Sequence, residues 1–234
     1  MTDKKRALVV GGTRGIGRGI AEGLVAAGWE VVAAGRNPHS TLQKAGLATT
    51  KIDVSDQRSV DEAVAQLDRL DALVNSAGII ARGGAEFEIE TFQRVIEVNL
   101  TGTMRLCVAC KPLLAASGGS IVNIASMLSF FGGPLVPAYT ASKGGVAQLT
   151  KALAAAWGAE GIRVNAVAPG WIATEMTQAL QADEARSAAI RARTPQGRWG
   201  TPEDLAGAVA FLCSDAAAFV NGVILPVDGG YLTV

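Results

Sequence analysis

Short hydrophobic runs alternate along the chain with segments in which apolar residues recur every three to four positions. Runs rich in Val, Ile and Ala predict buried strands, and the periodic segments predict amphipathic helices. The predicted strands are 7–11, 30–34, 48–52, 72–75, 120–125, 163–168 and 223–227. The predicted helices are 16–27, 60–67, 92–114, 139–157 and 202–212. Strands that are apolar on both faces and alternate with helices indicate a parallel sheet covered on both sides.

The alternation runs through the whole sequence of 234 residues, with no repeat, low-complexity tract or linker. We therefore predict one α/β domain, residues 1–234, with a doubly wound parallel sheet of about seven strands. Residues 112–142 carry no charged side chain, but they include several Gly, three Pro and Asn123. No run of 18 apolar residues occurs there, so we predict a strand, a loop and a helix start rather than a membrane span.

Charge and cysteine usage narrow the functional classes. The 21 basic and 21 acidic side chains cancel, which argues against binding to nucleic acid or a membrane through bulk charge. The charged start leads directly into a strand without a signal peptide, and the three Cys are an odd number, so we expect a reducing cytoplasm. Cys107 and Cys110 form a Cys-x-x-Cys, either a redox pair or, as we favour, two buried apolar residues. His39 is the single histidine and is expected in a solvated turn, so no Ser-His-Asp machinery and no metal site is predicted.

A glycine-rich turn joins the first predicted strand to the first predicted helix. Its glycines have separate tasks: Gly11 permits a sharp turn, Gly15 lets backbone amides approach a pyrophosphate, and Gly17 permits close helix–strand packing. Thr13, Arg14 and Ile16 complete the turn. The helix start adds unpaired N–H groups and the positive end of the helix dipole. The motif predicts binding of a dinucleotide.

A second motif carries candidate acid–base chemistry. Tyr139 and Lys143 are four residues apart and share one face of a predicted helix. Ser126 ends the fifth predicted strand, and Asn99 lies in the preceding helical segment. Each residue alone has a plain structural explanation, such as packing or capping. Together, behind the spacing Gly-x-x-x-Gly-x-Gly, they resemble the tetrad of the short-chain dehydrogenase/reductase family in order and spacing.

The resemblance covers nearly the whole chain and implies a Rossmann-type fold and an NAD(P)(H)-dependent oxidoreductase acting on a carbonyl/alcohol pair. Tyr139 would move the proton, with its pKa lowered toward working pH by Lys143 and the oxidised nicotinamide. Lys143 would also hold the nicotinamide ribose, Ser126 would bind the substrate oxygen, and Asn99 would anchor a water. Val10 departs from the family's usual Thr, and Ser76 from its usual Asn.

Further cofactor contacts follow from the same resemblance. Asp53 and Val54 match the pair that meets the adenine, and Asn75, Ala77 and Gly78 match the turn after the fourth strand of the sequence. Pro169, Gly170, Ile172 and Thr174 match the segment that meets the nicotinamide carboxamide. The polar helical stretch of about 171–199 would form a substrate lid, and a solvated excursion is the plainer alternative.

Arg36 follows the second predicted strand, where an acidic residue would bind a ribose 2′-hydroxyl. Gly35 would leave room there, and Arg36 with Arg14 could bind a 2′-phosphate, so NADP(H) is favoured over NAD(H). The alternative is that Arg36 is a solvated turn residue. The connection from Arg36 to Leu47 is short, which predicts an open rim at the adenosine end.

Substrate expectations rest on segments 123–130, 181–187, 197–200 and 227–232. These resemble the gluconate 5-dehydrogenase and 2-dehydro-3-deoxy-D-gluconate 5-dehydrogenase subgroup, which implies a sugar acid or polyol, with a lid arginine on its carboxylate. A 3-oxoacyl-(acyl carrier protein) reductase is the alternative within the family. A non-catalytic nucleotide-sensing regulator is the alternative from another class. Family membership would imply a homotetramer.

Overall fold

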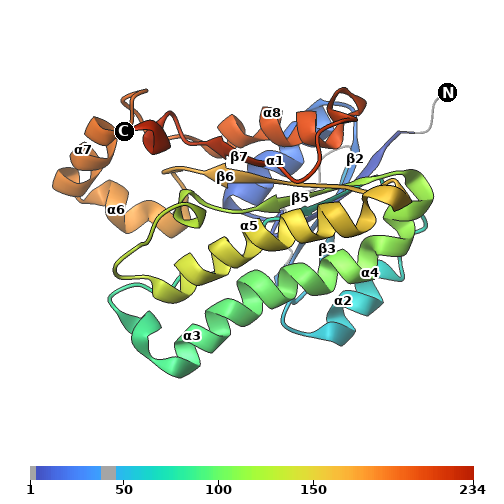
Figure 1. The fold of residues 1–234 in the computed structure, drawn as a ribbon, viewed down its shortest axis with the longest axis horizontal. Helices are drawn as coiled ribbons and strands as arrows, with labels where there is room; N and C mark the ends of the chain where they lie inside the picture. Colours follow the sequence, from blue (N-terminus) through green and yellow to red (C-terminus); the bar gives the residue numbers. More distant parts are fainter. Residues whose placement is uncertain (1–3, 38–45) are drawn as a thin grey trace.

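The computed structural model describes residues 4–37 and 46–234, and its centre is a seven-stranded parallel sheet in the order β3-β2-β1-β4-β5-β6-β7 (Figure 1). The strands are β1 Arg6–Val10, β2 Glu30–Gly35, β3 Leu47–Lys51, β4 Ala72–Asn75, β5 Ser120–Ile124, β6 Arg163–Pro169 and β7 Ile224–Val227. Every predicted strand is confirmed, with its ends within one residue. His39 and most of the connection from Arg36 to Leu47 lie outside the described residues.

Helices cover both faces of the sheet, as predicted. Helices α1 (Gly15–Ala26) and α8 (Pro202–Cys213) pack on one face, and α2 (Gln57–Val64), α4 (Gly102–Ser117) and α5 (Pro137–Trp157) pack on the other. The predicted helix 92–114 is two helices, α3 (Ile89–Ile96) and α4, joined by a π-helical segment, Glu97–Thr101. Single-turn 3₁₀ helices occupy Ala85–Phe87, Met127–Ser129, Gly158–Glu160, Glu175–Thr177, Asp215–Ala217 and Tyr231–Thr233.

Glycines in α1 allow the first and last large helices to pack closely. A Cβ on Gly19 would lie 2.5 Å from Pro202 Cβ, and one on Gly23 would lie 2.4 Å from Ala206 Cβ. Contacts this short cannot be relieved by a side-chain rotation, because the Cβ is fixed to the backbone. The two ends of the domain are therefore joined over one face of the sheet.

Residues 112–142 form the end of α4, strand β5, a 3₁₀ turn and the start of α5, as predicted from their composition. Strand β5 is buried along its whole length, which accounts for the lack of charge in residues 120–124. In the part of the chain that the structure describes, no helix has the length and apolarity needed to cross a membrane.

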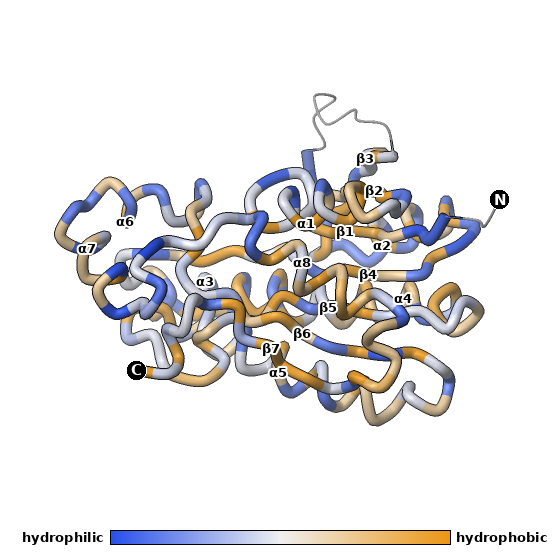
Figure 2. The backbone as a smooth tube through the Cα atoms, turned by 90° about the horizontal axis from the view of Figure 1, so that it is seen from above, coloured by the Kyte–Doolittle hydropathy of each residue, from blue (hydrophilic) through white to orange (hydrophobic). Residues whose placement is uncertain are grey.

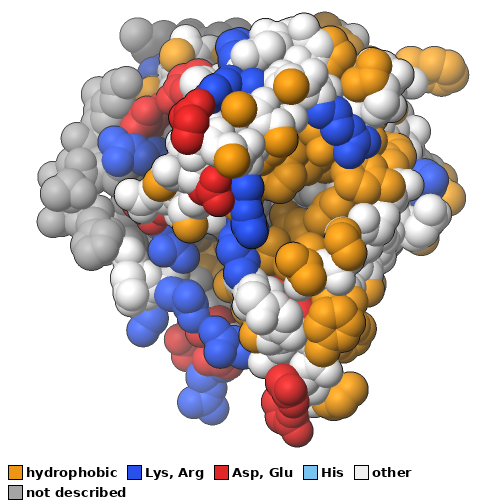
Figure 3. Space-filling view, turned by 90° about the vertical axis from the view of Figure 1, so that its left-hand side faces the viewer, with side chains coloured by type: hydrophobic (Ala, Val, Ile, Leu, Met, Phe, Trp, Pro, Cys, Tyr) orange, Lys and Arg blue, Asp and Glu red, His pale blue; other side chains and the backbone are white. Residues whose placement is uncertain are grey.

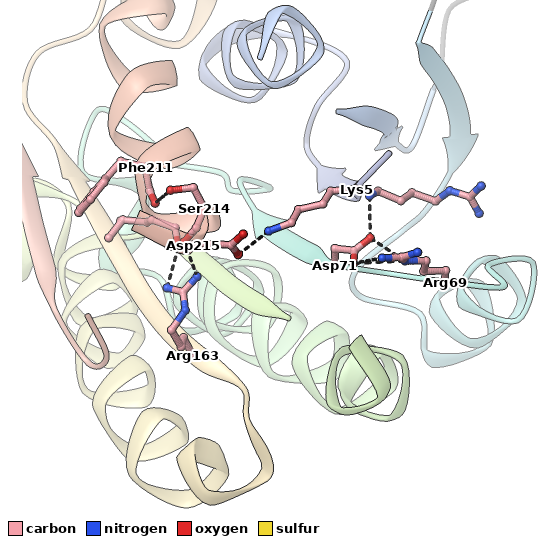
Figure 4. Close-up of polar contacts among 9 residues, drawn as sticks. Lys5, Arg69, Asp71, Arg163, Phe211, Ser214 and Asp215 are labelled. Atoms are coloured by element: carbon pink, nitrogen blue, oxygen red, sulfur yellow. Dashed lines mark hydrogen bonds and ion pairs between the residues drawn. The ribbon is translucent and has the colours of Figure 1, made fainter. Parts of the chain in front are cut away.

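Ion pairs and hydrogen bonds hold the edge of the sheet where the strands begin (Figure 4). The Lys5 ammonium lies 2.5 Å from the Asp215 carboxylate, and Arg163 donates to the carbonyls of Leu212 and Ser214. Asp71 accepts from Arg69 and from the backbone of Arg6. Most of these groups are partly exposed, so each contact contributes little to the free energy of folding.

The opposite edge, where the strands end, carries the polar excursion at 171–199. It contains α6 (Gln178–Ala182) and α7 (Glu184–Arg193), which are mostly hydrophilic and lie beyond the hydrophobic strands (Figure 2). Its base is closed by backbone bonds from Ala173 N–H to Gly200 C=O (2.8 Å) and from Gly200 N–H to Trp171 C=O (2.9 Å). These two bonds bring the two ends of the excursion together at the site edge.

Candidate active site

The predicted site residues gather at the carboxyl ends of the parallel strands. The chain runs outward from β1 to β3 and then crosses to β4 on the other side of β1, which opens a crevice between β1 and β4. This edge faces the viewer in Figure 3, which shows a hollow lined by hydrophobic side chains with Lys and Arg side chains along one side. The location agrees with the rule that open parallel sheets bind ligands where strand order reverses.

The glycine turn has the close approaches that its sequence predicts. Gly11 has φ +80°, and a Cβ there would lie 2.6 Å from the Ala77 amide nitrogen. A Cβ on Gly17 would lie 2.2 Å from the Gly11 carbonyl oxygen. The turn after β1 therefore lies directly against the turn after β4, and larger residues are excluded at both positions.

The start of α1 is available to an anion. Arg14 is its extended N-cap residue, and no side chain among residues 4–37 and 46–234 caps the helix. The N–H groups of the first turn, Gly15 to Gly17, are therefore left without helical acceptors. A Cβ on Gly15 would meet only Thr174, at 3.7 Å, so Gly15 places the Thr174 segment beside this helix end.

The adenosine end of the predicted site lies after β2 and β3. Arg36 is exposed, and its charge helps to hold the pKa of Asp53 low, although hydrogen bonds from Ser55 contribute most. The expectation about Gly35 needs correction. A Cβ at Gly35 would lie 2.6 Å from Thr13 Oγ1, so the missing side chain accommodates Thr13 rather than leaving open space.

Asn75 belongs to a buried polar network. Its amide donates to Asn123 Oδ1 (2.9 Å) and Cys107 Sγ (3.3 Å), and Asn123 donates to Thr150 Oγ1 (2.9 Å). Cys107 and Cys110 are fully buried, and burial raises the pKa of the Cys110 thiol to about 12 and that of Cys107 further. The Cys-x-x-Cys is thus part of the core, as favoured from the sequence.

The structure brings together three of the four predicted catalytic side chains at one point. The Ser126 hydroxyl lies close enough to the Tyr139 phenol to lower its pKa. Lys143 lies one turn further along α5, with its Nζ 5.6 Å from the Tyr139 ring centroid. Lys143 is 5% exposed, and its Nζ donates to the Ile124 carbonyl oxygen at 2.6 Å.

Asn99, the fourth residue, lies in the π-helical segment and uses its side chain for structure. Its Oδ1 accepts from Ile79 N–H (2.8 Å), and its Nδ2 donates to Ile79 C=O (2.9 Å) and Ser142 Oγ (3.0 Å). A Cβ on Gly78 would lie 3.4 Å from Asn99 Oδ1 and 3.8 Å from Lys143 Nζ. The turn after β4, the π-helical segment and α5 therefore meet around Gly78.

Burial shifts the pKa values of Tyr139 and Lys143 in opposite directions. Burial raises the pKa of Tyr139, against opposing effects of the Ser126 hydroxyl and the Arg82 charge. For the protein alone, desolvation of the phenolate is therefore the largest effect on this pKa. The expectation that Lys143 and the oxidised nicotinamide together lower the pKa of Tyr139 concerns the site with its cofactor and stays a prediction. Burial lowers the pKa of Lys143 to about 8.

Two residues at the site were missed from the sequence. Glu86 is 1% exposed and accepts from Ala81 N–H (2.9 Å) and Tyr139 N–H (2.8 Å). Arg82 lies close enough to Tyr139 to influence its pKa, and it donates to the Met176 carbonyl at 3.1 Å. No motif marks either residue, and a Glu in a polar loop is normally solvated. Only the tertiary contact reveals them.

In the segment predicted to meet the nicotinamide, Pro169 ends β6, and Gly170 lies close against the loop after β7. A Cβ on Gly170 would lie 2.7 Å from Asp228 Cα. Ile172 is buried, and Thr174 lies beside Gly15 of the glycine turn. The structure thus brings the segment from Pro169 to Thr174 and the glycine turn to one edge.

The arginines of the excursion have partners within it or next to it. Arg186 pairs with Asp183 (3.3 Å), Arg191 with Glu184 (2.9 Å) and Arg198 with Asp204 (2.6 Å). The Arg193 guanidinium lies over the rings of Tyr231 (4.3 Å) and Phe131 (5.6 Å). These contacts connect the excursion to the C-terminal segment and to the loop after β5.

The buried Lys143 makes a stability prediction. Because its pKa in the folded chain is near 8, below its ordinary value near 10.5, the charged form is disfavoured by folding at neutral pH. We expect Lys143→Met to increase the free energy of unfolding at pH 7 by about 1–3 kcal/mol. Between pH 8 and 10.5 the lysine binds more protons in the unfolded chain than in the folded chain. The free energy of unfolding of the wild type should therefore rise toward that of the variant across this pH range. Urea unfolding of both proteins at pH 7 and pH 10 measures this, and a difference that does not change with pH would contradict it.

Comparison with known proteins agrees with the site. Residues 10–232 match the family model described as "Enoyl-(Acyl carrier protein) reductase". A 2-dehydro-3-deoxy-D-gluconate 5-dehydrogenase of Pseudoalteromonas atlantica is 43% identical, over 97% of this chain and 96% of the relative. The structure of a gluconate 5-dehydrogenase from Burkholderia cenocepacia in complex with NADP and tartrate is 38% identical, with a TM-score of 0.94 over 99% of this chain and 96% of that chain.

A structure from Agrobacterium tumefaciens with bound NADP is 47% identical, with a TM-score of 0.92 over 100% of this chain and 98% of that chain. Similarity therefore extends over the full domain, including the glycine turn and the segment that carries Tyr139 and Lys143. The chain belongs to the short-chain dehydrogenase/reductase family.

Proposed function

We propose that the protein is an NADP(H)-dependent oxidoreductase that interconverts a secondary alcohol and a ketone on a sugar acid or a polyol. The observation that carries the proposal is the meeting of Ser126, Tyr139 and Lys143 at the carboxyl edge of the sheet. A phenol that lies near a hydroxyl and beside a buried cation is suited to move a proton at a substrate oxygen.

The chain offers a fitting cradle for the dinucleotide. The missing Cβ at Gly15 leaves the backbone open there, with Thr174 at 3.7 Å as its nearest neighbour, and the start of α1 offers unpaired amides to phosphates. Asp53 and Val54 would meet the adenine, and Ile172 and Thr174 the carboxamide. When bound, the nicotinamide supplies or accepts the hydride, which protein side chains cannot do.

The protein's own groups then handle the proton. Ser126 binds the substrate oxygen and stabilises the charge that develops on it, and Tyr139 donates or accepts its proton. Lys143 favours the phenolate electrostatically and binds the nicotinamide ribose. Because the Asn99 side chain is occupied, a water at this residue would bind its main-chain carbonyl, which also accepts from Thr103.

The NADP(H) preference rests on Arg36 and Arg14. Both are exposed near the end of the site where a ribose 2′-phosphate would lie. A guanidinium can bind a phosphate through two hydrogen bonds, whereas a 2′-hydroxyl offers it no charge partner. The two related structures hold NADP, which supports the same assignment.

The carboxylate of a sugar acid is better matched by Arg82 than by a lid arginine. Arg186, Arg191 and Arg198 already pair with carboxylates. Arg82 has no carboxylate within ion-pair distance in the described ranges, and its charge reaches Tyr139. The related gluconate 5-dehydrogenase was solved with tartrate, a hydroxy acid, which supports an acidic substrate class.

Neither alternative function gains support from the geometry. A 3-oxoacyl-(acyl carrier protein) reductase would need an available basic patch near the site, but the lid arginines mostly have acidic partners. A nucleotide sensor has no need for Ser126, Tyr139 and Lys143 to meet.

Three further assignments belong to this proposal. Residues 171–199 act as a lid, connected to the site through Arg82 and Met176. Exposed apolar side chains on α4 (Met104 and Val108) and on α8 (Phe211) support assembly as a homotetramer. Three unpaired thiols, all buried, fit the reducing cytoplasm.

The primary test is Tyr139→Phe in a screen of keto-sugar acids, polyols and acetoacetyl thioesters with NADPH. We expect wild-type turnover on sugar acids, and a loss of roughly two to four orders of magnitude in the variant, the scale of lost acid–base catalysis. NADPH affinity should stay nearly unchanged. Retained turnover would remove the role given to Tyr139, and a folded wild type that binds neither NADPH nor NADH would favour a scaffold or sensor.

Arg36→Ala tests the cofactor assignment. Loss of a charge-assisted contact should weaken NADPH binding about tenfold or more, while NADH binding changes little. Titration with both nucleotides measures the two affinities, with Arg58→Ala, an exposed arginine on α2, as the control. Equal losses for both nucleotides, or none, would return Arg36 to the role of a solvated turn residue.

Arg82→Ala tests carboxylate recognition. We expect kcat/KM for a keto-sugar acid to fall about tenfold or more relative to an uncharged keto-polyol, because only the acid loses an ion pair. The ratio of the two substrates cancels any common effect on Tyr139. Arg186→Ala, in the exposed pair with Asp183, should leave this ratio unchanged. A parallel fall for both substrates in Arg82→Ala would assign the arginine to general architecture.

A further inference from the structure

Glu86 is a carboxylate that the fold holds almost completely out of water. It is 1% exposed, whereas the other buried acid in the described part of the chain, Asp71, is 7% exposed and has a guanidinium partner. Both contacts of Glu86 are backbone amides, those of Ala81 at 2.9 Å and Tyr139 at 2.8 Å. A buried charge is tolerated only when its hydrogen bonds are satisfied, so these two contacts are what allow it to stay there.

The second contact supplies a cap that helix α5 lacks locally. Its N-cap residue is Val136, which has no polar side chain, and Pro137 follows at the first helical position. Tyr139 is the third residue of the helix, and its N–H has no helical acceptor. Glu86 comes from 53 positions earlier in the chain and accepts this bond. A carboxylate at this end of a helix also interacts favourably with the helix dipole.

The first contact joins this cap to the rest of the site. Glu86 and Ala81 belong to the segment that follows Gly78, in which Ile79 is bonded twice to Asn99. Arg82 of the same segment donates to Met176 of the excursion. The first turn of α5 is therefore held against the turn after β4 through one carboxylate.

We propose that Glu86 is a positioning residue for Tyr139: its carboxylate joins the segment after β4 to the first turn of α5 and so sets the direction and the electrostatic surroundings of the Tyr139 side chain. The proposal rests on the proposed function, because it gives Tyr139 the proton-transfer role. Glu86 itself contacts neither substrate nor cofactor in this scheme.

The electrostatic part has a defined sign. Ser126 from the end of β5 and Arg82 and Glu86 from the segment after β4 act on the Tyr139 phenol, and Lys143 of its own helix has its Nζ 5.6 Å from the ring centroid. Burial raises the pKa of Tyr139, Ser126 and Arg82 lower it, and the Glu86 charge raises it. Glu86 therefore favours the protonated phenol, the form that donates a proton during ketone reduction.

The test compares Glu86→Gln with Glu88→Gln. Glutamine keeps the shape of Glu86 and one acceptor oxygen but removes the charge, and Glu88 is an exposed carboxylate two residues further on. The measurement is kcat/KM for alcohol oxidation with saturating NADP against pH. For Glu86→Gln we expect kcat to fall about tenfold. We also expect the rising limb of the kcat/KM profile, where activity increases with pH, to move to lower pH by about half a unit. KM for NADP should be unchanged, and Glu88→Gln should behave as wild type.

A purely structural cap would lower stability or activity without moving the pH profile. An unshifted limb in Glu86→Gln therefore overturns the electrostatic part, and wild-type kcat overturns the positioning part. If Glu86→Gln does not fold, Glu86→Asp replaces it. Aspartate keeps the charge but is too short to reach both amides, so we expect a lower kcat with an unshifted limb, and wild-type kcat would overturn the proposal.

A second readout needs no turnover. The chain has two tyrosines, so the ultraviolet phenolate titration of each protein, minus that of its Tyr139→Phe counterpart, isolates the Tyr139 step. Glu86→Gln should move this step to lower pH. If the wild type shows no oxidoreductase activity but the step still moves, the proposed function fails while the effect of Glu86 on Tyr139 stands. If the protein is active and the step does not move, the electrostatic part of the proposal fails alone.

Discussion

The burial of one ammonium group constrains the whole carboxyl edge of the sheet. Lys143 is removed from water, and its Nζ has the Ile124 carbonyl at the end of β5 as acceptor. Its own carbonyl accepts from Ser129, and the preceding residue, Ser142, accepts from Asn99. Each contact joins α5 to a different element. These contacts fix the start of α5 against β5, the 3₁₀ turn after β5 and the π-helical segment. The buried charge of Lys143 itself destabilises the folded state.

A second buried element holds the same parts together from inside the core. Asn75, Asn123 and Thr150 form a chain of hydrogen bonds from β4 through β5 to α5. Within the described ranges Asn75 Oδ1 has no partner, so the network tolerates one unsatisfied acceptor. Its directional bonds specify one register of β4 against β5, which apolar packing alone leaves less defined. The register of β4 therefore determines the position of the turn at Ala77 and Gly78 beside Lys143.

Much of this arrangement could be predicted from sequence because it depends on local patterns. Strand positions follow from apolar runs, and Gly11 and Gly17 follow from the steric needs of one turn. Ser126, Asn99 and Tyr139 could be placed because, together with Lys143, they resemble the family's tetrad in order and spacing. The π-helical interruption at Glu97–Thr101 could not be predicted, because no Gly or Pro within it marks the change in backbone pairing. Gly35 was misread because its neighbour, Thr13, is contributed by another strand end. Likewise, the ion pair of Arg198 with Asp204 depends on how the end of the excursion meets α8.

Glu86 and Arg82 show why the charges around Tyr139 could not be predicted from the sequence. They lie four positions apart in one loop, where such a pair normally reads as solvated. The fold instead brings both to Tyr139, with opposite effects on the phenol. Under the proposed function, a substrate carboxylate bound to Arg82 would cancel part of its positive potential at Tyr139. The negative potential of Glu86 would then be less opposed, and the phenol would hold its proton more firmly once an acidic substrate is in place. One loop would thus couple recognition of the carboxylate to the protonation state of the group that acts on the same substrate.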